Sequence, residues 1–414
     1  MKFTPEQVIE IKQLFVKMNC KDDFLRLLNL AKRHVYGDKV IPFEERQLNY
    51  YINYNNNKKS SYISFTVKKK SGLDRTIHAP TKGLKEFQKA VNIILQCVYN
   101  PHIAATGFVL GKSIVDNAKP HLKQNYVYNI DLKDFFPSID KSRIWGRLLT
   151  QPFNLGDSNE RRAIANMISA ICATPMEVER FKNSEWKREL LSVLPQGAPT
   201  SPVLTNAICE KLDIRLSGVA KRFGLNYTRY ADDITFSSMH NTYENKSNQT
   251  EHIYVKDSSF DKEVRRIIND QRFFIKESKV RLQKQGFRQE VTGITVNENL
   301  NINSRYIKQL RQWLFYWESF GYEKAYYFFL QNYVTDRGRN KKGDPNMALV
   351  IDGKLLYLKM VKGESNAVYV KLKSRLDALL NHPKNQAEII KKNTDIVDLI
   401  LEIGLDAAMD HYTL

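Results

Sequence analysis

The most informative part of the chain is residues 227–237, YTRYADDITFS. β-Branched and aromatic residues flank Ala231-Asp232-Asp233 on both sides, which predicts two short strands joined at these three residues. Acidic side chains at such a junction are costly to bury unless a positive charge meets them. A divalent cation is a natural partner, because Mg²⁺ prefers oxygen ligands and is usually held by a few carboxylates together with substrate phosphates.

A third carboxylate ends another apolar segment earlier in the chain. Residues 126–131, YVYNID, are predicted to form a short strand that closes on Asp131. If that strand neighbours the pair at 227–237, Asp131 and Asp232 could hold two metal ions for an in-line displacement. A lone aspartate at a strand end is more often a turn or cap residue, and this is our interpretation of Asp134.

The charge balance indicates the kind of partner. The chain has 414 residues, with 64 Lys and Arg against 45 Asp and Glu, which gives a formal charge of +19. Hydrophobic residues at 42 % and charged residues at 26 % are typical of a folded protein. The basic surplus favours a polyanion, nucleic acid before an anionic membrane surface.

The hydrophobic segments, the N-terminal segment and the cysteines together predict where the protein is located. No segment reaches the roughly 18 uninterrupted apolar residues of a membrane-spanning helix, so we expect no membrane partner. The amphipathic N-terminus carries acids and is unlike a signal or transit peptide. The four cysteines are far apart in sequence, so we expect a reduced, cytoplasmic protein without a disulfide framework or zinc site.

Hydrophobic periodicity predicts the elements around these acids. Alternation at residues 63–67, resumed at 75–77, predicts a hairpin with a basic tip, and a helix follows over 84–99. Residues 141–192 are predicted to be mainly helical. A long amphipathic helix is predicted over 304–320, where we assign the aromatic residues to packing rather than to base stacking.

Three motifs give the chain a resemblance to the reverse transcriptases. Tyr230-Ala231-Asp232-Asp233 is similar to their YxDD box, residues 131–136 (DLKDFF) to their first catalytic-aspartate motif, and residues 194–202 (LPQGAPTSP) to their LPQGxxxSP element. The motifs occur in the family's order, and the resemblance extends over roughly residues 60–380.

The resemblance implies an α+β fold of the right-hand polymerase type, with fingers, a palm built on an antiparallel sheet, a helical thumb and a helical C-terminal extension. We expect residues 1–110 to form N-terminal helices and fingers. Residues 111–300 would form the palm, with fingers helices interleaved around 141–192. Residues 301–376 would form an RNA-binding thumb and residues 377–414 the extension, whose task the sequence does not indicate.

The resemblance also assigns site residues. Asp131 and Asp232 would be catalytic and ligate two Mg²⁺ ions, which Mn²⁺ could replace, with Asp233 supporting them. The dNTP-binding residues would be a triphosphate-gripping arginine, an aromatic steric gate against the ribose 2′-hydroxyl, two pocket-lining residues and a proton-donating lysine, namely Arg75, Phe136, Gln196, Gly197 and Lys279. The alternatives are a solvated hairpin tip for the arginine, a core position for the phenylalanine and an ordinary surface site for the lysine.

Two shorter elements resemble those of bacterial retron reverse transcriptases. Residues 117–121 (NAKPH) match their NAxxH element, and residues 291–293 match their VTG triplet. The RNA-binding residues implied are Asn117, His121, Val291, Thr292 and Gly293, to which we add Arg311 in the predicted thumb helix. His121 could equally be a packed helix residue, and the basic loop at 337–343 could be either a phosphate contact or merely solvated.

Enzymes of that family bind a structured non-coding RNA, use a guanosine 2′-hydroxyl in it as primer, and copy part of it into a branched RNA–DNA hybrid (msDNA). The resemblance therefore implies an RNA-directed DNA polymerase, with that RNA as template and primer, its cDNA as product and dNTPs as substrates. It also implies a role in anti-phage defence with a separate effector protein. Three alternatives stay open: another defence-associated reverse transcriptase making concatenated or untemplated DNA, a mobile-intron-type enzyme, and an RNA-binding protein on an inactive polymerase scaffold.

Overall fold

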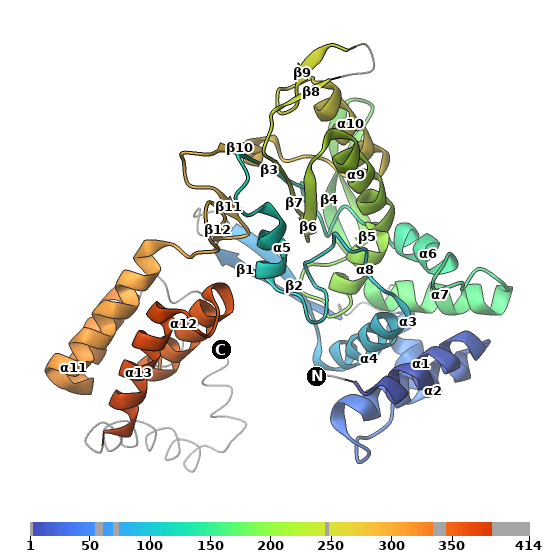
Figure 1. Ribbon diagram of the computed structural model, residues 1–414. Coiled ribbons are helices and arrows are strands. Elements are labelled where there is room, and N and C mark those ends of the chain that lie inside the picture. The colour runs from blue at the N-terminus through green and yellow to red at the C-terminus, as the bar shows by residue number, and fades with distance from the viewer. Residues whose placement is uncertain (1–2, 54–60, 69–73, 245–247, 334–344, 383–414) are drawn as a thin grey trace. The chain divides into compact units, whose positions relative to one another are not determined.

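The computed structural model describes residues 3–53, 61–68, 74–244, 248–333 and 345–382. The chain divides into two compact units, Met1–Phe287 and Arg288–Leu414 (Figure 1). The basic loop at 337–343 and most of the expected C-terminal extension lie outside the described residues. The expected domain names and boundaries stay predictions. Of the helices that the structure describes, none combines the length and the apolar character needed to cross a membrane.

The first unit begins with helices that share one hydrophobic core: α1 (Pro5–Lys17), α2 (Lys21–Tyr36), α3 (Glu45–Ile52) and α4 (Lys82–Val98). Thr4 caps α1, since its side chain accepts a hydrogen bond from the backbone N–H of Gln7. Phe15, Leu28 and Phe87 are buried where these helices meet. The apolar stripe of each helix thus faces its neighbours.

The predicted hairpin is present as β1 (Tyr62–Lys68) and β2 (Asp74–Pro80), which pair antiparallel. Residues 69–72 of its expected basic tip lie outside the described residues. Its base is tied to the LPQG segment, because the backbone N–H of His78 donates to the carbonyl of Gln196 at 3.0 Å. Arg75 lies on the same strand and is exposed.

A four-stranded antiparallel sheet lies at the centre of the unit (Figure 1), and its strand order is β10–β3–β7–β6. The strands are β3 (Tyr126–Asp131), β6 (Asn226–Tyr230), β7 (Asp233–Ser238) and β10 (Arg281–Lys284). One face packs on α9 (Glu210–Phe223) and α10 (Ser259–Asp270) through Phe223, Phe236 and Phe260. The other face carries polar residues, including Asn129 and Thr235, whose side chains hydrogen-bond at 3.1 Å. The α+β class and the antiparallel palm sheet are confirmed.

Further elements surround this sheet: α5 (Ile114–Ala118), η2 (Lys119–His121), α6 (Lys141–Leu149), α7 (Asn159–Cys172), α8 (Ser201–Ile208), β8 (Thr242–Glu244), β9 (Thr250–His252) and η3 (Glu277–Lys279). The segment from 194 to 200 leads into α8, and the carbonyl of Gln196 bonds β2 as described above.

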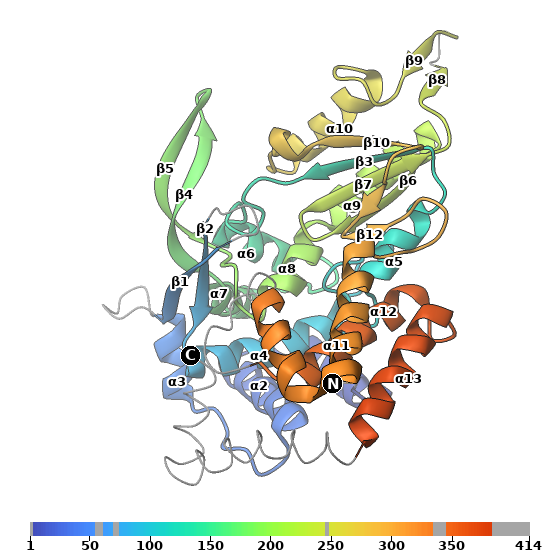
Figure 2. The same cartoon turned by 90° about the vertical axis from the view of Figure 1, so that its left-hand side faces the viewer.

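The prediction that residues 141–192 are mainly helical is wrong for their second half. After α6 and α7 the chain forms a long hairpin, β4 (Thr174–Lys182) and β5 (Glu185–Val193), which projects from the unit (Figure 2). Asn183 and Ser184 have φ values of 51° and 64° and form the two-residue turn between the strands. Two successive positive φ values suit the right-handed twist of a hairpin, and they allow Phe181 and Trp186 to pair across it.

The second unit contains β11 (Glu290–Val291), β12 (Ile294–Thr295), α11 (Ser304–Tyr333), α12 (Met347–Lys362) and α13 (Ala367–Asn381). The predicted helix at 304–320 is present, but the helical segment continues to Tyr333 beyond a break at Gly321, whose φ of 80° and ψ of 170° interrupt the helix. Trp313 and Trp317 are both 1 % exposed. Their assignment to packing is therefore confirmed.

Candidate active site

The turn between β6 and β7 holds Asp232. Tyr230 and Asp233 pair across the hairpin, which leaves Ala231 and Asp232 as the turn residues. Ala231 has a φ of 57°, a left-handed conformation that L-residues seldom adopt. Gly107 lies against this turn so closely that a Cβ atom there would be 2.6 Å from the backbone nitrogen of Ala231. Only glycine allows this approach.

Strand β3 brings the third carboxylate to the same place. Asp131 pairs with Asp233 in the antiparallel register, and the N–H of Leu132 donates to the carbonyl of Asp232 at 3.0 Å. Residues directly opposite each other on neighbouring strands share a face of the sheet. Asp131 and Asp233 therefore lie on the polar face, next to the turn that carries Asp232.

The three carboxylates influence one another electrostatically. Burial raises the pKa of Asp232, and the charge of Asp131 raises it further. Partial removal from solvent, followed by the charges of Asp232 and Asp131, raises the pKa of Asp233 to about 6, although this residue keeps an exposed edge. The site thus concentrates negative charge, which favours a cation as partner.

Two basic side chains meet this negative charge. Lys279 Nζ, from η3, donates to Asp131 Oδ2 at 2.6 Å. The exposed Arg75 on β2 lies close enough for its charge to lower the pKa of Asp232, against the larger effect of burial. The structure therefore brings together Asp131, Asp232, Asp233, Lys279 and Arg75, as expected from the sequence. Their roles in catalysis stay predictions.

The residues present fit a magnesium site in their chemistry. Carboxylates are the ligands that Mg²⁺ prefers. Burial first, and then the charges of the neighbouring carboxylates, raise the pKa values of Asp232 and Asp233, and a divalent cation would offset that repulsion. Among the described residues, no three acidic, histidine or cysteine side chains converge as a ready-made metal site. The carboxylate of Asp131 is engaged by Lys279.

Phe136 follows Asp131 by five residues and lies in a partly open position. Its ring centroid is 5.4 Å from that of Phe135, which is buried, and 6.1 Å from that of Phe108. The ring centroid of Phe108 in turn lies 6.3 Å from that of Tyr230 in the YADD turn. Phe136 is thus packed on one side and half-buried, an arrangement that suits a gate better than the core position we kept as an alternative.

Gln196 and Gly197 lie against the β1–β2 hairpin. A Cβ atom on Gly197, whose φ is 124°, would lie 2.9 Å from both the carbonyl oxygen of His78 and Cγ2 of Ile77. The close approach that glycine permits here is to β2 itself. Gly197 is exposed, so its other side remains open to a ligand.

The NAxxH residues are buried. Asn117 and His121 are each 0 % exposed, and the ring nitrogens of His121 hydrogen-bond the hydroxyls of Ser237 at 2.7 Å and Thr228 at 2.8 Å. Burial lowers the pKa of His121 to about 3, so the ring is neutral. With no exposed atoms, these side chains favour the alternative of packed residues over direct RNA contact.

The other expected RNA-binding residues belong to the second unit. Val291 is 0 % exposed, and Thr292 is half-buried with a φ of 47°. Gly293 and Arg311 are exposed. Val291 therefore packs within the β11–β12 turn, and only its neighbours and Arg311 present surface that RNA could contact.

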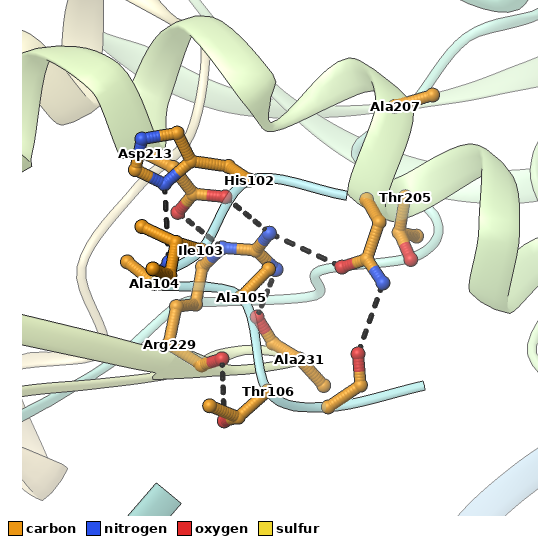
Figure 3. Close-up of polar contacts among 12 residues, drawn as sticks. His102, Ile103, Ala104, Ala105, Thr106, Thr205, Ala207, Asp213, Arg229 and Ala231 are labelled. Atoms are coloured by element: carbon orange, nitrogen blue, oxygen red, sulfur yellow. Dashed lines mark hydrogen bonds and ion pairs between the residues drawn. The ribbon is translucent and has the colours of Figure 1, made fainter. Parts of the chain in front are cut away.

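Sequence reasoning missed a buried polar cluster beneath the YADD turn (Figure 3). Arg229 and Asp213 form an ion pair whose side chains are both 0 % exposed. Asn206 joins them by accepting a hydrogen bond from Arg229 at 3.1 Å. The available signal was an arginine inside a predicted strand, since a buried arginine requires a paired acid.

Comparisons with known proteins agree with this geometry. The family model described as reverse transcriptase (RNA-dependent DNA polymerase) matches residues 67–293, more than half of the 414 residues. The retron Mx162 reverse transcriptase of Myxococcus xanthus is 39 % identical over 244 residues, which cover 57 % of this chain and 47 % of that protein. The retron Ec86 reverse transcriptase of Escherichia coli is 39 % identical over 181 residues, covering 43 % and 49 %.

A third relative is covered more fully. The retron Ec83 reverse transcriptase of Escherichia coli is 30 % identical over 254 residues, which cover 60 % of this chain and 74 % of that protein. The chain spans about half the length of the Mx162 and Ec86 relatives. Among solved structures, telomerase from Candida albicans aligns with 90 % of this chain and 71 % of its own at 8 % identity, with a TM-score of 0.41, a likeness too low to add to the family match.

Proposed function

This chain belongs to the reverse transcriptase (RNA-dependent DNA polymerase) family and is of the bacterial retron type, and we propose on that premise that it is an RNA-directed DNA polymerase. One observation carries the proposal: Asp131, Asp232 and Asp233 meet at one end of the antiparallel sheet. Lys279 and Arg75 lie beside them, as a reaction that handles a triphosphate requires.

Each of these residues has a task that suits its chemistry. Asp131 and Asp232 would hold two Mg²⁺ ions, for which Mn²⁺ could substitute, and Asp233 would support them. When bound, such ions activate an attacking hydroxyl and stabilise the leaving pyrophosphate. The guanidinium fork of Arg75 would grip the triphosphate of a dNTP. Lys279 would donate a proton to the departing pyrophosphate.

The pocket around the incoming nucleotide would be completed by three further residues. The ring of Phe136 would exclude a ribose 2′-hydroxyl and so select deoxynucleotides. Gln196 and Gly197 would line the pocket, since their backbone joins the fingers hairpin through His78.

The substitution Asp232→Asn tests the polymerase assignment. It removes a carboxylate with almost no change of volume, so we expect dNTP incorporation on a primed RNA template to fall by at least about 10³-fold, as losing a metal-ion contribution predicts. Binding of the same RNA should stay near the wild-type level. Asp270→Asn, an equivalent change at a surface ion pair of α10, serves as the control and should leave synthesis unchanged. Synthesis retained by Asp232→Asn would overturn the assignment.

The finer proposal follows the family resemblance. The template and primer would be a structured non-coding RNA, its 2′-hydroxyl would start synthesis, and the product would be branched msDNA. The protein would act in the cytoplasm, in anti-phage defence, together with a separate effector protein. The nucleic acid that accompanies the purified protein distinguishes this from the other polymerase alternatives.

A further inference from the structure

A buried ion pair lies directly beneath the turn that carries Asp232 (Figure 3). Arg229 Nε donates to Asp213 Oδ1 at 2.7 Å, and Nη2 donates to Oδ2 at 2.6 Å. Both side chains are 0 % exposed. This two-point pairing of a planar guanidinium with a carboxylate fixes the orientation of the arginine as well as its position.

The remaining donors of Arg229 reach the catalytic turn and α8. Nη1 donates to the carbonyl oxygen of Ala231 at 3.1 Å, and Nη2 donates to Asn206 Oδ1, also at 3.1 Å. The amide of Asn206 then donates to the carbonyl oxygen of Gly107 at 2.9 Å. One guanidinium therefore connects α9, α8 and the residue that precedes Asp232.

The main chain of Arg229 is held as firmly as its side chain. Its N–H donates to the carbonyl of Ala104 at 2.8 Å, and its carbonyl accepts from the N–H of Thr106 at 2.9 Å. The next residue, Gly107, presses on the turn from this side, leaving no space for a Cβ atom. Both the segment at 104–107 and the guanidinium thus hold the turn.

These contacts matter because the turn contains a residue in an unfavourable backbone conformation. The left-handed conformation of Ala231 is unfavourable for an alanine and persists only where neighbouring structure enforces it. The hydrogen bond from Arg229 is made to the carbonyl of that same residue. Burying an ion pair is in general a poor way to gain stability, since desolvation offsets much of the attraction. The hydrogen bonds that the Arg229–Asp213 pair makes at the turn indicate a role other than stability.

We propose that Arg229 is a positioning residue for DNA synthesis: held by Asp213 and Asn206, it fixes the Ala231 carbonyl and so sets the place of the Asp232 carboxylate. The proposal rests on the proposed polymerase function. It concerns the orientation of the turn, and it assigns to Arg229 no contact with substrate.

The test compares Arg229→Lys with the wild type. Lysine keeps the charge opposite Asp213 but cannot span Asp213, Asn206 and Ala231 at once, because it lacks the planar fork. We expect kcat for single-dNTP incorporation, per folded molecule, to fall by about 10- to 100-fold, since a shift of about 1 Å at a reacting group costs up to about 10²-fold. The KM for dNTP should change by less than about threefold, and RNA binding should be unchanged.

A second readout reports on the turn without activity. Amide hydrogen exchange of the peptide that covers Asp232 should be faster in Arg229→Lys, because the turn loses its fixed carbonyl contact. The matched control is Arg147→Lys, since Arg147 pairs with Glu210 on the same helix, α9, and its other hydrogen bonds go to Ala207, Thr150 and Gln151 rather than to the turn. This control should leave both kcat and exchange at the turn as in the wild type.

The outcomes separate this proposal from the function on which it rests. Wild-type protein that incorporates no dNTP overturns the polymerase function itself. An active wild type with unchanged kcat and exchange in Arg229→Lys overturns the positioning role, as does an equal loss in Arg147→Lys. If Arg229→Lys does not fold, Asn206→Ala replaces it: this variant keeps the Arg229–Asp213 pair and should show a smaller loss of kcat with the same faster exchange, while wild-type values would overturn the proposal.

Discussion

Phe136 is half-buried, with one side against Phe135 and its edge near Phe108, which itself contacts the YADD turn. This position leaves the ring partly exposed rather than fully in the core, and we propose that it meets the sugar of an incoming nucleotide there. We therefore expect Phe136→Ala to admit ribonucleotides, lowering the preference for dNTPs by about 10- to 100-fold, the range that a single steric contact provides.

The measurement for Phe136→Ala is the ratio of kcat/KM for a dNTP and the matching rNTP on one RNA template. Phe181→Ala, at an exposed ring of the β4–β5 hairpin, is the control and should keep the wild-type ratio. An unchanged ratio in Phe136→Ala would place that ring in the core instead.

His121 has a role in stability that depends on pH. Its folded pKa of about 3 lies below the value of 6.5 expected for an unfolded histidine. The unfolded chain therefore binds the extra proton between these values, and stability present above pH 6.5 is lost as the pH falls towards 3. From pH 7 to pH 5 this amounts to about 2 kcal/mol of unfolding free energy.

Urea unfolding of the wild type and His121→Gln at both pH values measures this effect. Glutamine can still bond the hydroxyls of Thr228 and Ser237 but does not titrate, so its loss of stability between pH 7 and pH 5 should be smaller by about 2 kcal/mol. Equal losses in both proteins would contradict the neutral, buried state of His121.

Single functional residues could be predicted from the sequence where the neighbouring residues mark the end of a strand. Asp131, Asp232 and Asp233 follow apolar strands, so their positions could be read from alternation and turn residues. The partners of Arg229 could not, because Asp213 and Asn206 lie on helices that reach it only in the folded chain. His121 could have been exposed or buried, and only the packing of η2 against β6 and β7 decides between these.

Among the elements, the β4–β5 hairpin shows where periodicity misleads. Its strands carry many charged residues, and its turn is Asn183-Ser184 rather than the Asn-Gly pair that marks such turns most clearly. The turn therefore contains no glycine that would indicate the positive φ of both of its residues. Because the preceding residues form the helices α6 and α7, the helical prediction was continued into the residues of the hairpin, where it is wrong.

The same turn predicts a stabilising substitution. Ser184 has a φ of 64°, where a Cβ atom is unfavourable, so Ser184→Gly should raise the free energy of unfolding by about 0.5–1 kcal/mol. Thermal or urea unfolding measures this change. Ser184→Val, which adds a branched side chain at the same φ, should be destabilised, and a gain of stability in Ser184→Val would contradict the turn geometry.

In the molecule as a whole, the net charge of +19 and the acidic site have different roles. The carboxylates concentrate negative charge at one end of the sheet, while the basic surplus attracts a polyanion to the chain as a whole. A protein with both properties suits a nucleic acid that is bound broadly and processed at one point. We propose that this processing is DNA synthesis on a bound RNA.

The most direct test is to purify the protein from cells that carry its native locus and to sequence the nucleic acid that accompanies it. We predict a single DNA species joined to an RNA through a ribonuclease-resistant branch nucleotide, and its absence from the Asp232→Asn protein. Concatenated, homopolymeric or protein-linked DNA would contradict the retron product, and RNA without any DNA would contradict the polymerase itself.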